Sequence, residues 1–122
     1  MKLVLDVGQC AADHWSIRQL IEDNFDARVV QAHSARETLD KLRAEKFDLV
    51  LVNRLLDTDS SEGLEIVSAV KGDPALSSTA LMLVTNYAEH QAAAVAAGAE
   101  PGFGKAQMHQ SDVLERLAHY LS

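Results

Sequence analysis

The stretch Asp48–Asn53, with the sequence DLVLVN, is the most strand-like segment of this chain. Its apolar residues run without a break, and the run is too short for a helix. An unbroken apolar strand is expected where both faces of a sheet are covered, as in a parallel sheet. The segment Ala80–Thr85, ALMLVT, has the same character. Both segments therefore predict buried strands of a parallel sheet.

Helical patterns alternate with short apolar strands along the rest of the chain. Asp13 or a neighbour is expected to cap the first helix, and Ser34 with Glu37 forms a capping-box pattern before the second. Gly98 is expected to stop the fourth helix. The expected strands are 3–7, 28–32, 48–53, 80–85 and 101–104, and the expected helices are 13–25, 34–45, 63–71, 89–97 and 111–121.

This alternation predicts one α/β domain, 1–122, with no linker or second domain. Five strands and five helices in strict alternation imply a doubly wound (βα)5 fold, with helices on both faces of a parallel sheet. A sheet of this size usually has the strand order 2-1-3-4-5 of flavodoxin-like folds.

The composition excludes several classes of protein. The 122 residues are 48% apolar and 24% charged, and 11 Lys and Arg against 18 Asp and Glu give a net charge of −7. Because phosphate backbones are bound by clustered Lys and Arg, we expect no nucleic-acid partner. A single cysteine, Cys10, excludes an internal disulfide. No apolar run is long enough for a signal peptide or a membrane span, so we expect a cytoplasmic protein with no membrane partner.

Polar residues gather where the predicted strands end. Ligands of open α/β sheets bind beyond the carboxyl ends of the strands, where the strand order reverses between the first and third strands. Polar groups would be costly to bury at these positions without a purpose. The residues expected there are 6–10, 53–56, Thr85 with Asn86, and Gly104 with Lys105.

Four motifs resemble the response-regulator receiver family of two-component signalling. They are DLVLVN at 48–53, GLEIV at 63–67, LMLVTN at 81–86 and AAGAEPGFGK at 96–105. The resemblance covers the whole chain. It implies the predicted fold and, in typical members, transfer of a phosphoryl group to an aspartate that ends strand three. Mg²⁺, held by an acidic pair after strand one, assists that transfer.

The family's site residues are only partly present in this chain. Thr85 and Lys105 match the family's hydroxyl and lysine positions, while Asn53 falls on the position of the phosphoacceptor aspartate. Gly8 and Gln9 fall on the acidic pair.

Other positions depart from the pattern too. If the alignment with the family is counted from the start of strand one instead, Asp6 comes close to the site. In either alignment this chain keeps at most one acid of the family's pair. Ala106 replaces the proline that usually follows the lysine, and Gly102 stands where the family has a switching aromatic residue. The loop between strand three and Gly63 is longer than the family's usual spacing.

These departures indicate a receiver scaffold that works without phosphorylation. An amide is a very poor nucleophile for forming an acyl phosphate. Mg²⁺ is normally held by one or two carboxylates, so no metal or other cofactor is expected. Asn53 is interpreted as a structural amide that hydrogen-bonds Lys105 or Thr85. Those two residues would still favour an anion, because an ammonium and a hydroxyl can both donate to one.

Two alternatives remain open. Asp57, in an acidic loop with Asp59 and Glu62, would be a substitute phosphoacceptor with Mg²⁺, although a solvated acidic turn is the favoured interpretation. Alternatively, Lys105, Thr85 and the strand-end amides would form a sensor of small anions or nucleotides.

The favoured function is a signalling module and not an enzyme. A single domain has to produce its output by binding another chain, so we expect a signalling protein as partner, such as a histidine kinase or a downstream effector. In the resembled family the surface of helix four, strand five and helix five binds partners, which implies Tyr87, Phe103 and Tyr120 as contacts here.

Overall fold

The computed structural model describes all residues, 1–122, and contains one five-stranded parallel sheet of order β2-β1-β3-β4-β5. This confirms the predicted fold and strand order. The strands are β1 (Lys2–Val7), β2 (Ala27–Ala32), β3 (Leu49–Asn53), β4 (Leu81–Val84) and β5 (Glu100–Phe103). The helices are α1 (Ala11–Asn24), α2 (Ala35–Ala44), α3 (Gly63–Gly72), α4 (Ala88–Ala96) and α5 (Ser111–Leu121), and a short 3-10 helix, η1 (Lys105–Gln107), follows β5.

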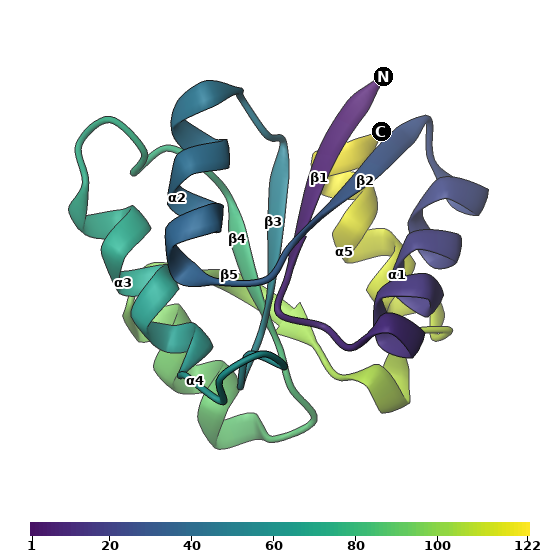
Figure 1. Ribbon diagram of the computed structural model, residues 1–122. Coiled ribbons are helices and arrows are strands. Elements are labelled where there is room, and N and C mark those ends of the chain that lie inside the picture. The colour runs from purple at the N-terminus through teal and green to yellow at the C-terminus, as the bar shows by residue number, and fades with distance from the viewer.

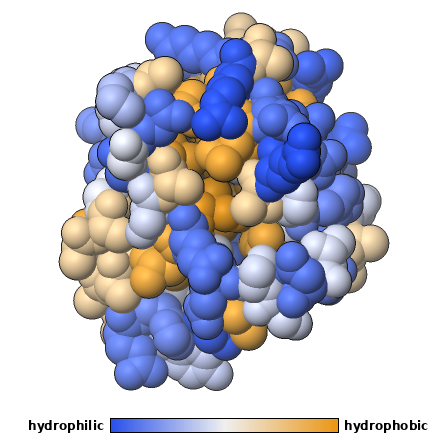
Figure 2. Space-filling model, turned by 60° about the vertical axis from the view of Figure 1, so that its left-hand side comes forward, coloured by the Kyte–Doolittle hydropathy of each residue, from blue (hydrophilic) through white to orange (hydrophobic).

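The helices form two layers around the sheet. Helices α1 and α5 cover one face, and α2, α3 and α4 cover the other (Figure 1). Every residue of β3 except Asn53 is buried, because apolar side chains of one strand enter both layers. Leu49 and Leu51 pack with α1 and α5, whereas Val50 and Val52 pack with α2 and α3. Hydrophobic residues show between polar side chains on the α2–α3 side (Figure 2).

Helix α1 starts earlier than expected, and the predicted Asp13 cap is wrong. The residue before the helix is Cys10, whose side chain makes no capping hydrogen bond. Asp13 lies inside the first turn, and its carboxylate is bound to Lys105 instead.

The predicted cap of α2 is confirmed on one side. Ser34 Oγ accepts from Glu37 N at 3.1 Å, but the Glu37 carboxylate accepts from His33 N and not from Ser34.

The exposed edge of β5 is covered by side chains from both neighbouring helices. Gln91 of α4 accepts a hydrogen bond from Gly102 N at 3.0 Å and donates one to Leu83 O at 2.9 Å. Arg116 of α5 donates to Gly102 O. A Cβ on Gly102 would lie 2.2 Å from Leu83 O, so no side chain fits where the resembled family has its switching aromatic residue. Polar side chains thus fix the junction of β4, β5 and α4.

Gly98 ends α4 as predicted. Its φ of +110° lies in the left-handed region that favours glycine, and a Cβ there would lie 2.9 Å from Lys71 Cγ. None of the helices combines the length and apolar character that crossing a membrane requires.

Candidate functional site

A cleft of about 210 Å³ opens at the carboxyl ends of β3 and β4, where the topology predicts a site. It brings together Asn53, Thr85 and Lys105 as the sequence predicts. Arg54 and Tyr87 line it as well. Arg54 falls in the range 53–56 that the topology predicts at the site, whereas Tyr87 was predicted only as a partner contact. Its complete lining is Asn53, Arg54, Leu55, Val84, Thr85, Asn86, Tyr87 and Lys105.

A larger hollow, of about 730 Å³, lies at the opposite end of the sheet. Two of its cations are already satisfied, since Arg43 pairs with Asp73 and Lys71 donates to the carbonyls of Ser77 and Thr79. The smaller cleft lies at the carboxyl ends of the strands, where ligands of open α/β sheets bind, so it is the candidate site.

Asn53 acts as a hydrogen-bond donor to the backbone. Its Nδ2 donates to Gly8 O at 3.2 Å and to Leu55 O at 2.8 Å. The predicted bonds to Lys105 or Thr85 are absent. The Lys105 ammonium, which can only donate, is bound to Asp13 instead. An ionised aspartate only accepts hydrogen bonds, so it would bring a negative charge against two carbonyl oxygens at this position. The local backbone therefore suits an amide and opposes a carboxylate.

Gly8 and Leu56 together exclude an acidic side chain from the end of β1. Gly8 has a φ of +76°, and a Cβ there would lie 2.3 Å from Leu56 Cδ2. Leu56 is buried and held by a tight loop, in which its N–H donates to Ser61 O and its carbonyl accepts from Ser60 N. The long loop after Asn53 thus folds back and places an apolar side chain over Gly8.

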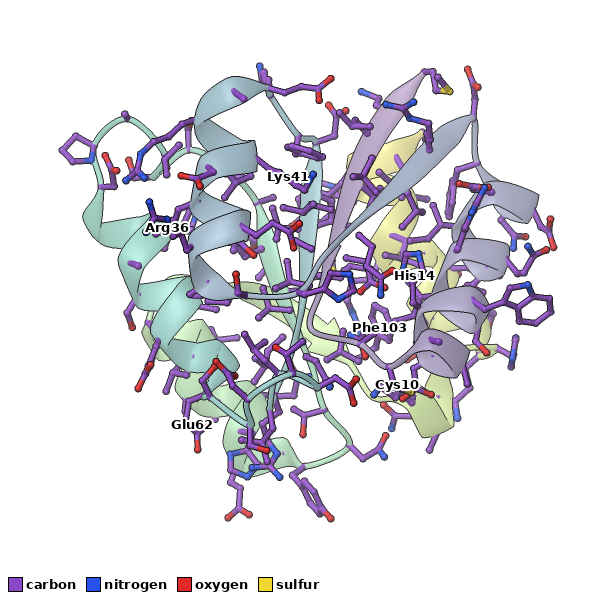
Figure 3. All side chains as sticks on the ribbon, in the orientation of Figure 1. Cys10, His14, Arg36, Lys41, Glu62 and Phe103 are labelled. Atoms are coloured by element: carbon purple, nitrogen blue, oxygen red, sulfur yellow. The ribbon has the colours of Figure 1, made fainter.

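Asp6 is fully buried and points toward α1. Its Oδ2 lies 2.7 Å from His14 Nδ1, and Figure 3 shows His14 reaching from α1 toward β1. Burial raises the pKa of Asp6 to about 6, although the hydrogen bond from His14 works in the opposite direction. The carboxylate is therefore committed to His14, and the sequence did not indicate this pair.

Gln9 is buried beside this pair. No hydrogen-bond partner within the protein reaches either end of its amide, or Asp6 Oδ1.

Lys105 binds Asp13 and neither Asn53 nor Thr85. Its Nζ lies 2.7 Å from Asp13 Oδ2, and this hydrogen bond lowers the pKa of Asp13. Thr85 is buried at the base of the cleft, and its Oγ1 accepts from Tyr87 N at 3.3 Å. The threonine can still donate its own hydroxyl hydrogen into the cleft.

Arg54 and Tyr87 form the rim of the cleft. The Arg54 guanidinium lies 5.9 Å from the centre of the Tyr87 ring, within the range of a cation–π contact. Tyr87 is 57% exposed, and Arg54 takes part in none of the ion pairs of the molecule. The rim thus presents an unpaired positive charge against an exposed aromatic ring.

The three predicted partner contacts do not share one surface. Phe103 is wrong as a contact, because it is 1% exposed and packs in the core under α1 and α5. Tyr120 is partly buried and lines the hollow at the opposite end of the sheet. Tyr87 alone stands at the cleft.

The acidic loop after Asn53 is solvated, as expected. Asp57, Asp59 and Glu62 are all exposed. Asp59 accepts from the N–H and hydroxyl of Ser61, and these bonds lower its pKa. The backbone N–H of Asp57 donates to Gly8 O at 2.9 Å, which anchors the loop at the end of β1.

The residues at the end of β1 and β3 do not fit Mg²⁺. That ion prefers near-octahedral oxygen coordination and at least one free carboxylate. Here the Asn53 amide directs its N–H groups at the backbone, Leu56 covers Gly8, and Asp6 is paired with His14. Asp13 is paired with Lys105. Metal-assisted phosphoryl transfer therefore has no support in this donor set.

Comparison with known proteins identifies the fold. No family model matches the sequence, and no curated protein matches it either. Solved receiver domains match the structure over nearly its whole length. The signal receiver domain of a DNA-binding response regulator from Colwellia psychrerythraea has a TM-score of 0.81 at 22% identity, with 98% of this chain and 96% of that one covered.

Two further structures agree with this match. A putative response regulator from Chloroflexus aurantiacus has a TM-score of 0.86 at 16% identity, over 98% of this chain and 96% of that one. The chemotaxis protein CheY4 of Vibrio cholerae has a TM-score of 0.77 at 22% identity, over 99% of both chains. At these identities the shared property is the receiver fold.

Proposed function

We propose that this chain is a receiver-like module of a two-component type pathway that works by binding another protein, without phosphorylation of residue 53. The observation that carries the proposal is the pair of hydrogen bonds from Asn53 Nδ2 to Gly8 O and Leu55 O. An amide is a very poor nucleophile, and the nitrogen of this one already donates hydrogen bonds to the backbone.

The rest of the site supports the same conclusion. Gly8 has no room for a side chain, and the carboxylates of Asp6 and Asp13 are paired with His14 and Lys105. The expected partner is a signalling protein, such as a histidine kinase or a downstream effector, and the expected compartment is the cytoplasm. The proposal assigns no enzymatic activity, no metal and no other cofactor to the domain.

Phosphorylation is tested by incubating the protein with acetyl phosphate and Mg²⁺ and measuring its intact mass. We expect no added phosphoryl group on the wild type, on Asn53→Asp or on Asp57→Asn, while a receiver domain with a complete site gains one under the same conditions. Label on the wild type that disappears in Asp57→Asn would establish the rival function, a receiver that uses Asp57.

Binding is tested by affinity capture from a native extract, with the protein either untreated or first incubated with acetyl phosphate and Mg²⁺. We expect the same partner in equal amount from both samples. A partner recovered only after treatment would show that the module is a phosphorylation switch.

A further inference from the structure

We propose that the cleft between Arg54, Thr85 and Lys105 receives a carboxylate side chain of the partner protein. This inference rests on the proposed function, because it specifies the chemistry of the partner at the same site. The donors come from three strand ends: Arg54 follows β3, Thr85 follows β4 and Lys105 follows β5. They line the same cleft, and none of the residues that line it is acidic.

Charge favours an acidic group in this cleft. Arg54 has no ion-pair partner in a protein whose net charge is −7, and the nearby Tyr87 ring holds its guanidinium at the rim. A guanidinium binds a carboxylate with two parallel hydrogen bonds when the geometry allows. Lys105 shares its charge with Asp13, so it adds a weaker attraction at the base.

The volume of the cleft favours a single side chain over a larger ligand as its occupant. Sites for drug-sized molecules usually measure roughly 300–1,000 Å³. The cleft measures about 210 Å³, which suits one acidic side chain and is small for a nucleotide.

Exposure favours a protein as the source of that carboxylate. Tyr87 stands 57% exposed at the mouth, and tyrosine and arginine are enriched among the residues that carry most of the binding energy of protein interfaces. His90 lies edge-on to the Tyr87 ring, with ring centres 5.8 Å apart, and supports it from α4. A free anion would fill the cleft and leave this aromatic rim unused.

The test uses blocked five-residue peptides, alanine at every position except a central glutamate or glutamine, titrated into ¹⁵N-labelled protein at low salt. We expect the glutamate peptide to shift the amide resonances of Leu55, Asn86 and Tyr87 along a saturating curve. The glutamine peptide should bind at least roughly tenfold more weakly, as expected for loss of one charge-assisted hydrogen-bonded pair.

Two variants distinguish binding in the cleft from a general effect of the protein's charge. Arg54→Gln should weaken binding of the glutamate peptide roughly tenfold or more. Arg36→Gln removes the same charge from α2, where Figure 3 shows Arg36 well away from the cleft, and should leave binding unchanged. Equal binding of both peptides, or an Arg54→Gln variant that binds like the wild type, would overturn the inference.

Inorganic phosphate is titrated in parallel. Saturation by phosphate at concentrations where the glutamate peptide causes no shift would assign the cleft to a small free anion and overturn the inference. The acetyl phosphate experiment is independent of this result, so the failure of either proposal is recognised separately.

Discussion

The ammonium of Lys105 and the carboxylate of Asp13 lie 2.7 Å apart, although 92 positions separate them in the sequence. The pair ties η1, after β5, to the first turn of α1. It gives Lys105 a permanent counter-ion inside the chain, so the lysine needs no phosphoryl group or metal-bound acid to balance its charge. The same carboxylate limits how strongly the lysine attracts an outside anion.

Asp13→Asn should therefore strengthen binding of the glutamate peptide to the cleft. The substitution removes the negative charge closest to Lys105 and leaves the lysine free to donate to the bound carboxylate. We expect a several-fold tighter interaction at low salt in the same resonance titration, with a smaller gain at high salt because the pair is partly exposed. Asp23→Asn, on the last turn of α1, is the matched control. Unchanged or weaker binding by Asp13→Asn would mean that Lys105 does not take part in recognition.

Asn53→Asp should destabilise the fold at neutral pH. The carboxylate loses both N–H donors and faces Gly8 O and Leu55 O. Leu55 O then lacks a partner, and Gly8 O keeps only its bond from Asp57 N. Leaving buried or half-buried acceptors unpaired costs roughly 1–3 kcal/mol of unfolding free energy. Urea unfolding at pH 7 measures the loss, which should shrink at pH 4, where a protonated aspartate can donate again. Asp57→Asn is the control, and a more stable Asn53→Asp protein would contradict the donor role of Asn53.

Gly8→Ala should destabilise the protein through Leu56. The added Cβ meets Leu56 Cδ2, and alanine is strained at a φ of +76°. Leu56→Ala alone should cost about 2–5 kcal/mol as a buried large-to-small change. In the double variant the contact is relieved, so the summed cost of the single changes should exceed that of the double change.

Gly72→Ala is the control for that cycle, because no atom lies within 4 Å of a Cβ built there and its φ is not positive. It should leave the unfolding free energy nearly unchanged. Additive costs for Gly8→Ala and Leu56→Ala would show that the two residues do not compete for the same space.

Asp6→Asn should stabilise the protein above pH 6 and have little effect near pH 4. The pKa of Asp6 is raised from 3.8 to about 6, so between these values the folded state holds a proton that the unfolded state has released. The stability that this carboxyl contributes is therefore complete below its unfolded pKa and is lost as the pH rises through about 6. Each pKa unit corresponds to about 1.4 kcal/mol, so the asparagine should gain roughly 2–3 kcal/mol at pH 7.5.

Thermal and urea unfolding of wild type and Asp6→Asn from pH 4 to pH 8 measure this difference. Asparagine can still hydrogen-bond His14, which keeps packing nearly constant across the comparison. A constant difference over the whole pH range would show that Asp6 does not titrate in this window.

Gln91→Ala should loosen the junction of β4 and β5. The change leaves the N–H of Gly102 and the carbonyl of Leu83 without their side-chain partner, at a cost of roughly 1–3 kcal/mol. Hydrogen exchange at Gly102 should accelerate in proportion. Gln110→Ala, at an exposed position with no side-chain hydrogen bond, is the matched control. Unchanged protection at Gly102 would mean that Gln91 is not its partner in solution.

The fold was predictable because each strand and helix can be identified from the residues of its own segment. The apolar runs at Asp48–Asn53 and Ala80–Thr85 identify parallel strands from their own composition, and the alternation with helical patterns leaves one common topology. The position of the cleft follows from that topology alone, without knowledge of any side-chain contact.

The contacts within the site were not predictable in the same way. Asp6 with His14, Asp13 with Lys105 and Gly8 with Leu56 depend on how a loop folds back and which face of α1 meets the sheet. Phe103 was misassigned because it was carried over from the partner surface of the resembled family, whereas in this chain its side chain packs in the core under α1 and α5. The departures from the family's residues at Asn53 and Gly8 did indicate where the contacts of this site differ from those of the family.

The covered edge of β5 has a consequence for how this molecule associates with others. Gly102 has both its N–H and its carbonyl occupied by Gln91 and Arg116, and Pro101 has no N–H to offer. An incoming extended peptide would find no free backbone ladder on this side, so the sheet resists growth by strand addition and edge-to-edge aggregation there. A partner that binds on this side has to contact side chains. The specificity of that complex therefore depends on the amino-acid sequence and not on backbone hydrogen bonding.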